Sequence, residues 1–183
     1  MPNMKKKQCS ILLGVLVLCL NCFGGGIQKQ GSVLGYHHGV VKTQGGSFRV
    51  GELSDAWQEQ DTEYRAVLFL NKNDASTITI DSWCQRAAAD GSLEGLTQDL
   101  LRGLADVQIQ QTQMHNTHGR AALLTEAQGD MDGREIFMST FVFKMNACVF
   151  DFVYVTLPGE LLYYQDFKNM IDGFAFIKGP KLL

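Results

Sequence analysis

The chain has 183 residues, a length that suits a single domain with one core. Its formal net charge is −3 at pH 7. Removal of the first 21 residues by export would take away three lysines and no acid, so the net charge would fall from −3 to −6. This acidic balance, without a cluster of Lys and Arg, argues against a nucleic-acid partner.

The N-terminal region has the layout of an export signal. Residues 5–7 are lysines, and residues 11–20 form an almost uninterrupted apolar run. The run is shorter than the roughly 20 residues that a membrane-spanning helix needs. We therefore predict a signal peptide over residues 1–21 rather than a transmembrane anchor.

The stretch CLNC that ends at Cys22 resembles the lipobox of bacterial lipoproteins, in which this cysteine receives diacylglycerol. Asn21 departs from that pattern, which prefers Gly, Ala or Ser there, and Gly24 to Gly26 provide a flexible tether. We expect a lipid on Cys22, and Phe23 after it is compatible with the periplasmic face of an outer membrane. An ordinary secretory signal cut near Gly24 to Gly26, giving a soluble periplasmic or secreted protein, is the alternative.

Residues 22–46 are predicted to be a tether and N-terminal segment, residues 47–177 a single domain, and residues 178–183 a tail. Residues 64–71 are apolar and β-prone, residues 77–83 alternate in polarity, and the turn formers between them predict a β-hairpin.

A helix is predicted over residues 92–105, where leucines recur at helical spacing and Ser92 can cap the first turn. Strand character returns in four segments separated by turn residues: 107–114, 121–127, 136–144 and 148–156. A final helix is expected to begin at Pro158. This order predicts an α+β fold in which an antiparallel β-sheet is sandwiched by helices.

The segments SLEGLTQDLLRGL, GRAALLTEAQGDMDGRE, CVFDFVYV and MIDGFAF follow one another in an order that resembles the PsbP-like sandwich of many small bacterial lipoproteins. The resemblance covers roughly residues 47–176. It implies binding and assembly rather than covalent chemistry, and it carries no catalytic residues.

Cys84 and Cys148 are the cysteines that remain if Cys9 and Cys19 leave with the signal and Cys22 is lipidated. In an oxidising compartment two thiols either pair or are buried, so a Cys84–Cys148 disulfide and two buried free thiols are both open.

His115, His118, Asp130 and Asp132 are weak metal-ligand candidates. Zinc or copper needs three or four converging ligands, and the Asp-rich turn lacks the Gly and Glu of a calcium-binding EF-hand. Solvent-exposed loop residues explain all four, so no metal or cofactor is expected.

Tyr64, Phe137, Phe141 and Phe143 are more aromatic side chains than one core face is expected to absorb, and they predict a binding surface on the sheet. The leading interpretation is a non-enzymatic, lipid-anchored module that binds or assembles with an unknown protein partner. A periplasmic carrier of a small ligand or metal ion is the alternative. A small hydrolase has the least support, because the sequence lacks a nucleophile motif.

Overall fold

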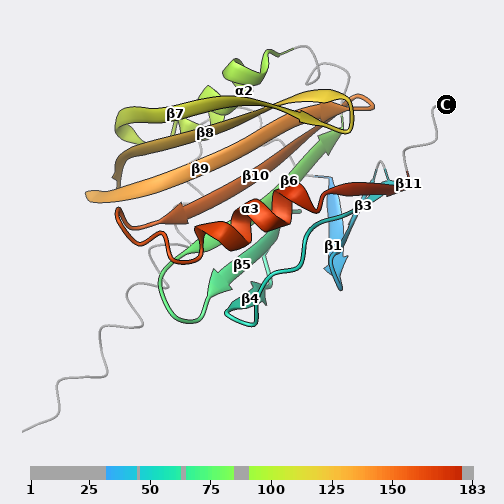
Figure 1. Ribbon diagram of the computed structural model, residues 1–183, viewed down its shortest axis with the longest axis horizontal. Coiled ribbons are helices and arrows are strands. Elements are labelled where there is room, and N and C mark those ends of the chain that lie inside the picture. Colours follow the sequence, from blue (N-terminus) through green and yellow to red (C-terminus); the bar gives the residue numbers. More distant parts are fainter. Residues whose placement is uncertain (1–31, 45, 63–64, 85–90, 179–183) are drawn as a thin grey trace, which may run out of the picture.

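Figure 1 shows the computed structural model of the chain, which describes residues 32–44, 46–62, 65–84 and 91–178. Two antiparallel sheets and two helices make up this part of the chain. The predicted α+β class, with helices on both sides of an antiparallel sheet, is confirmed.

The larger sheet has seven strands in the order β4-β5-β6-β10-β9-β8-β7. Their bounds are β4 Trp57–Gln60, β5 Val67–Asn71, β6 Thr77–Cys84, β10 Cys148–Thr156, β9 Arg134–Met145, β8 Arg120–Met131 and β7 Ala105–Thr117. The predicted hairpin is the pair β5 and β6, and the four later strand segments form the β7-to-β10 meander, so both expectations are confirmed.

The smaller sheet has the order β1-β2-β3-β11, with β1 Val33–His37, β2 Val40–Thr43, β3 Gly46–Arg49 and β11 Ala175–Lys178. The predicted boundary at residue 46 is therefore wrong, because β1, β2 and the start of β3 belong to the folded domain. Val33, Val41 and Phe48 are buried in its main core, which gives this Gly-rich segment its stability.

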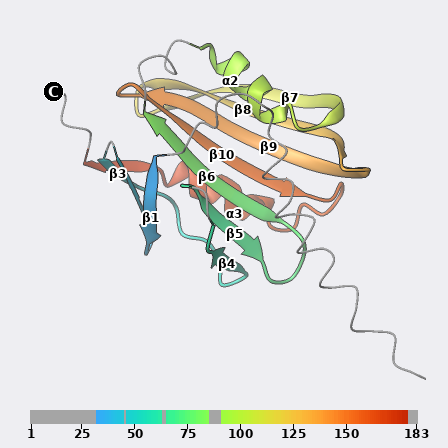
Figure 2. The ribbon, with the colours of Figure 1, turned by 180° about the vertical axis from the view of Figure 1, so that it is seen from behind.

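The two helices cover opposite faces of the large sheet, α2 (Leu93–Leu101) on one and α3 (Tyr164–Asp172) on the other (Figures 1 and 2). Ser92 caps α2 as predicted, since its Oγ accepts a hydrogen bond from the Gly95 amide at 3.0 Å. The final helix begins at Tyr164 and not at Pro158, because residues 157–163 form turns that include Gly159 at φ 81°.

β9 and β10 are buried on both faces because their apolar side chains alternate in direction. Phe141, Phe143, Phe150 and Phe152 enter the core under α3 and the small sheet. Val142 and Val149 point the other way and pack with Leu93 of α2.

Gly51 allows the small sheet and α3 to approach closely. A Cβ atom at Gly51 would lie 2.0 Å from the Asn169 carbonyl oxygen, and the Gly51 amide donates to the Met170 carbonyl at 3.0 Å. A larger residue at position 51 would have to displace the helix backbone.

Four hairpins turn through two residues that both have positive φ angles, the backbone of a type I′ turn. Three of these turns end in glycine, and the fourth is Asn146-Ala147, in which Ala147 has φ 60°. In this left-handed conformation the Cβ atom of alanine is in steric conflict with the backbone, and glycine has no Cβ atom.

We expect Ala147→Gly to raise the free energy of unfolding by about 0.5–1 kcal/mol, because relief of this steric cost outweighs the greater flexibility of glycine in the unfolded chain. Urea unfolding measures the change. Ala121→Gly, at an exposed position in β8, is the matched control and should destabilise the protein by a similar amount. A loss of stability in both variants would contradict the strain at Ala147.

Candidate functional site

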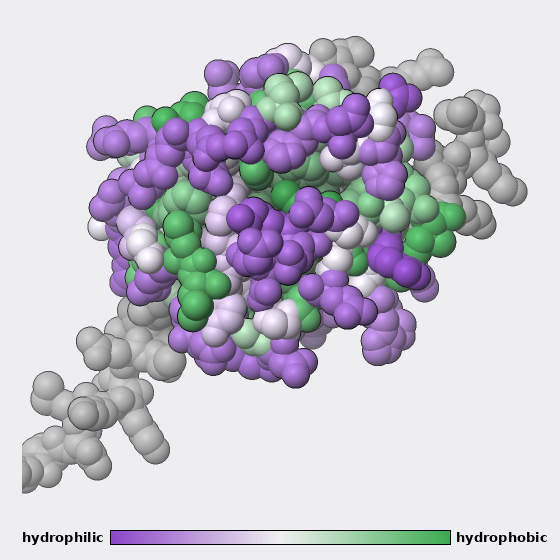
Figure 3. Space-filling view, viewed as in Figure 1, coloured by the Kyte–Doolittle hydropathy of each residue, from purple (hydrophilic) through white to green (hydrophobic). Residues whose placement is uncertain are grey.

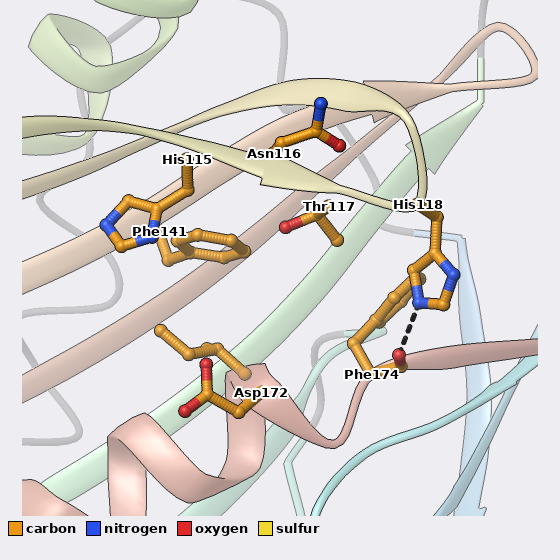
Figure 4. Close-up of a pocket in the computed structure, with 8 residues that line it drawn as sticks. His115, Asn116, Thr117, His118, Phe141, Asp172 and Phe174 are labelled. Carbon is orange, nitrogen blue, oxygen red and sulfur yellow. Dashed lines mark hydrogen bonds between the residues drawn. The ribbon is translucent and has the colours of Figure 1, made fainter.

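A small polar pocket of about 180 Å³ lies between the β7–β8 hairpin and the C-terminal end of α3 (Figure 4). Its rim carries His115, Asn116, Thr117, His118 and Asp172. Its apolar side is formed by Phe141, Ile171 and Phe174, all of which are buried. In the space-filling view, polar surfaces of α3 and of the sheet flank a recess with apolar atoms at its base (Figure 3).

The type I′ turn at His118 and Gly119 positions the side chains that form one wall of the pocket. The Asn116 Oδ1 atom accepts a hydrogen bond from the Gly119 amide at 2.9 Å and closes the turn. His118 Nε2 lies 2.6 Å from the Phe174 carbonyl oxygen (Figure 4). Because a carbonyl only accepts, Nε2 carries a hydrogen, and a neutral His118 ring has its lone pair on Nδ1.

His115 stands on the sheet side of the pocket, where its ring makes an edge contact with Phe141 at a centroid distance of 5.9 Å. Asp172 lies on the helix side. The pocket is smaller than the roughly 300–1,000 Å³ of most small-molecule sites, so it suits one small polar group or one side chain of a larger ligand.

The metal candidates are not brought together. Asp130 and Asp132 lie at the β8–β9 turn, and His118 lies at the other end of β8, about 35 Å away along an extended strand. Asp130 Oδ1 accepts the Gly133 amide at 2.7 Å, so it stabilises the turn. The described residues contain no group of three or more His, Cys, Asp or Glu side chains suited to a metal ion.

The predicted aromatic binding surface is wrong for three of its four residues. Phe137, Phe141 and Phe143 are only 3%, 2% and 0% exposed, because α3 and the small sheet cover this face. Phe143 stacks on Phe150 at 4.9 Å between ring centroids, deep in the main core. Tyr64 lies outside the described residues.

A partly buried polar network lies between α3 and the sheet. The Tyr164 hydroxyl donates to Glu126 Oε1 at 2.6 Å and lies 3.1 Å from the Ser139 hydroxyl. Burial, together with the bond to Glu126, raises the pKa of Tyr164 well above its usual value, so the phenol stays protonated as a donor. Ser139 is fully buried, which leaves its hydroxyl inaccessible to a substrate.

Cys84 and Cys148 form a disulfide. The predicted pairing is therefore confirmed, and the alternative of two buried free thiols is wrong. They are direct partners on the neighbouring strands β6 and β10. Structural disulfides persist in oxidising compartments, so the bond indicates an extracytoplasmic location.

Asp81 and Asp151 face each other directly across β6 and β10, a feature that the sequence analysis missed. Burial raises the pKa of Asp81 from 3.8 to about 6, although the Ser82 amide donates to its carboxylate at 2.6 Å and works in the opposite direction. The alternation of residues 77–83 would have placed Asp81 on one face, but it gives no sign of the carboxylate opposite.

No family model matches the chain, and no curated protein matches it either. Among solved structures, LpqN of Mycobacterium tuberculosis, described as involved in cell envelope biogenesis, is 13% identical with a TM-score of 0.55, and the match covers 74% of this chain and 86% of LpqN. At this identity the likeness concerns the fold alone.

Two further solved structures superpose less closely. The cyanobacterial PsbP protein CyanoP of Synechocystis sp. PCC 6803 is 15% identical with a TM-score of 0.45, over 84% of this chain and 95% of that one. PA94 of Pseudomonas aeruginosa, a protein of unknown function, is 17% identical with a TM-score of 0.46, over 71% and 90%. These two superpositions are too loose to carry an argument.

Loss of the disulfide is expected to lower the free energy of unfolding by about 2–4 kcal/mol, because the bond joins cysteines 64 residues apart and restricts the unfolded chain. The variant is Cys84→Ser with Cys148→Ser, measured by urea unfolding with and without a reductant. The reductant should destabilise the wild type and leave the double variant unchanged. Equal unfolding midpoints for oxidised and reduced wild type would count against a stabilising bond.

The raised pKa of Asp81 means that the folded protein holds this proton more tightly than the unfolded chain. The free energy of unfolding therefore falls as the pH rises from about 4 to about 6, by on the order of 2–3 kcal/mol. Asp81→Asn keeps the acceptor for the Ser82 amide, so we expect it to stabilise the protein by about 2 kcal/mol at pH 7.5 and not at pH 3.5.

Urea unfolding across this pH range tests the Asp81 prediction. Asp132→Asn, at an exposed turn, controls for the loss of one negative charge. A gain for Asp81→Asn that is equal at both ends of the pH range would contradict the burial of a charge at neutral pH.

Proposed function

We propose that the protein is an exported, lipid-anchored module that binds or assembles with a partner and carries out no covalent chemistry. The observation that carries this proposal is the Cys84–Cys148 disulfide, which fits a domain that acts outside the cytoplasm. The export-signal layout before Cys22 supplies the route, and the lipobox-like CLNC supplies the anchor.

Likeness in fold supports a role at the cell envelope. LpqN, whose fold this chain shares, is described as involved in cell envelope biogenesis. Phe23 after Cys22 is compatible with the periplasmic face of an outer membrane. Among the described residues, no helix has the length and apolar character to cross a membrane.

A binding role is supported by the surroundings of Cys84 and Ser139, two side chains of the types that act as nucleophiles in hydrolases. The sulfur of Cys84 is bonded to Cys148 and is therefore no free thiol. Ser139 is fully buried, and its hydroxyl is a hydrogen-bond partner of the Tyr164 hydroxyl. Neither side chain contacts a histidine through an accessible cleft, which is the arrangement that a small hydrolase would need.

The second candidate function is a carrier for one small polar ligand, favoured by the pocket beside His115 and Asp172. Its volume of about 180 Å³ restricts such a ligand to a few heavy atoms. The carrier has less support than the anchored module, because the metal candidates of the sequence lie at opposite ends of β8.

The test is the intact mass of the mature protein extracted from membranes of the producing cell, beside a Cys22→Ser variant. We expect a mass equal to residues 22–183 plus diacylglycerol, and loss of this species and of membrane retention in the variant. A bare polypeptide that starts near residue 25 and is found in the soluble fraction would refute the anchor and leave a soluble exported protein.

A further inference from the structure

β7 is a long edge strand that nothing covers within the described part of the chain. It ends the seven-stranded sheet and runs for 13 residues, from Ala105 to Thr117. Every residue from Ala105 to Asn116 is exposed, so neither helix covers either face of this strand. Figures 1 and 2 show it at the margin of the large sheet from both sides.

After Asp106, the sequence of β7 lacks the charged and proline side chains that usually keep exposed edges apart, and the remaining protective features are two bulges in its pairing with β8. Edge strands are commonly protected by lysine, other charges or proline. Residues 107–116 (VQIQQTQMHN) contain no Pro, Asp, Glu, Lys or Arg, and consist largely of Gln, Thr and apolar residues. Two such edges would therefore meet without repulsion between like charges.

The face of β7 on the α2 side is symmetric about Thr112. Ile109, Thr112 and Met114 lie opposite Ala127, Thr125 and Leu123 of β8, which places all three on this face. A bulge leaves Gln110 without a partner in the register, so that, counted along β8, Ile109 and Met114 each lie two positions from Thr112. Both are exposed, Ile109 by 57% and Met114 by 61%.

The other face has the same symmetry. Gln111 and Gln113 lie opposite Glu126 and Leu124 of β8, one position on either side of Thr112. In an antiparallel pair of identical strands centred on Thr112, each Gln111 would face a Gln113, and amide side chains can donate and accept at once. An edge that is complementary to itself on both faces is the hallmark of a twofold contact.

We propose that β7 is a self-association strand: two copies of the protein pair antiparallel about Thr112 and join their large sheets into one. Ile109 of each copy then packs against Met114 of the partner subunit, which shields four exposed apolar side chains from part of their contact with water. A second copy is the occupant that this symmetry fits, because the apolar and amide positions of β7 match those of its own reversed sequence.

The twofold axis of such a pair stands perpendicular to the sheet. Both copies therefore present the same face to the same side, and their chains enter the domain at Ser32 on that same side. Two copies anchored in one membrane can pair in this way without turning either domain over.

Cysteine cross-linking of the full chain in membranes of the producing cell tests the proposal. Thr112→Cys places each new thiol directly opposite its own copy, at a spacing of about 4.5–5.5 Å between Cα atoms, and should give a covalent dimer on mild oxidation. Ile109→Cys with Met114→Cys should do the same. Ile109→Cys alone should not, because its two copies would lie about 13 Å apart along the strands.

The chain without added cysteines is the control for cross-links through its own thiols. A dimer band for Thr112→Cys and for the paired variant, with none for Ile109→Cys alone, is the expected result. No dimer with either of the first two, or equal dimer with all three, overturns the pairing about Thr112. A ladder of higher oligomers also overturns it, because a twofold contact closes at two copies.

Charge substitutions at the same exposed positions give a second test by cross-linking efficiency of Thr112→Cys. Ile109→Lys with Met114→Lys should reduce dimer formation at least about tenfold, since like charges would face each other across the strands. Ile109→Lys with Met114→Glu should restore it, because the charges become complementary. Leu34→Lys, at an exposed position in β1, is the matched control and should have no effect.

Discussion

The structure depends on the need to cover β9 and β10 on both faces. Their phenylalanines point to one side, and their valines point to the other together with Ile136 and Met138, so neither face can be left in water. α3 and the small sheet cover the phenylalanine side, and α2 covers the other side. The disulfide then links β10 to β6 at one end of this two-sided core.

Coverage that is centred on β9 and β10 leaves the margin of the sheet exposed. α2 packs on β8 and β9 and does not reach β7, and every side chain of β7 up to Asn116 stays exposed. The pocket arises at the same boundary, where the end of α3 stops below the β7–β8 hairpin and leaves polar side chains above the buried Phe141. The candidate pocket and the proposed self-association strand thus have one origin.

Local sequence patterns predicted the elements whose stability is local. Residues 77–83 alternate and form the expected strand. Residues 92–105 repeat every turn of a helix, but the helix covers only Leu93–Leu101, and Ala105 already belongs to β7. β1 and β2 fall in the predicted tether and N-terminal segment because their Gly-rich, polar sequence carries no period of its own, and only the packing of Val33 and Val41 into a distant core reveals them. Alternation likewise showed that Phe141 and Phe143 share a face, but it could not show that α3 covers this face. The pocket could not be predicted from the sequence for the same reason, because it forms only where the end of α3 lies beside a turn about 55 residues earlier in the chain.

The position of the disulfide has a consequence for a domain that is held by its N-terminus. The chain enters the described domain at Ser32, whose amide donates to the Ser82 carbonyl at 2.6 Å, and its hydroxyl lies 3.8 Å from the sulfur of Cys84. In the proposed anchored protein, tension from the membrane would therefore be applied to β6 at Ser82, two residues from the bond that fastens β6 to β10. A strand held only by backbone hydrogen bonds can be peeled away from its end, whereas a covalent link at that end passes the load to the central strand of the sheet. The bond thus protects the strand pairing at the point where an anchored domain would be pulled.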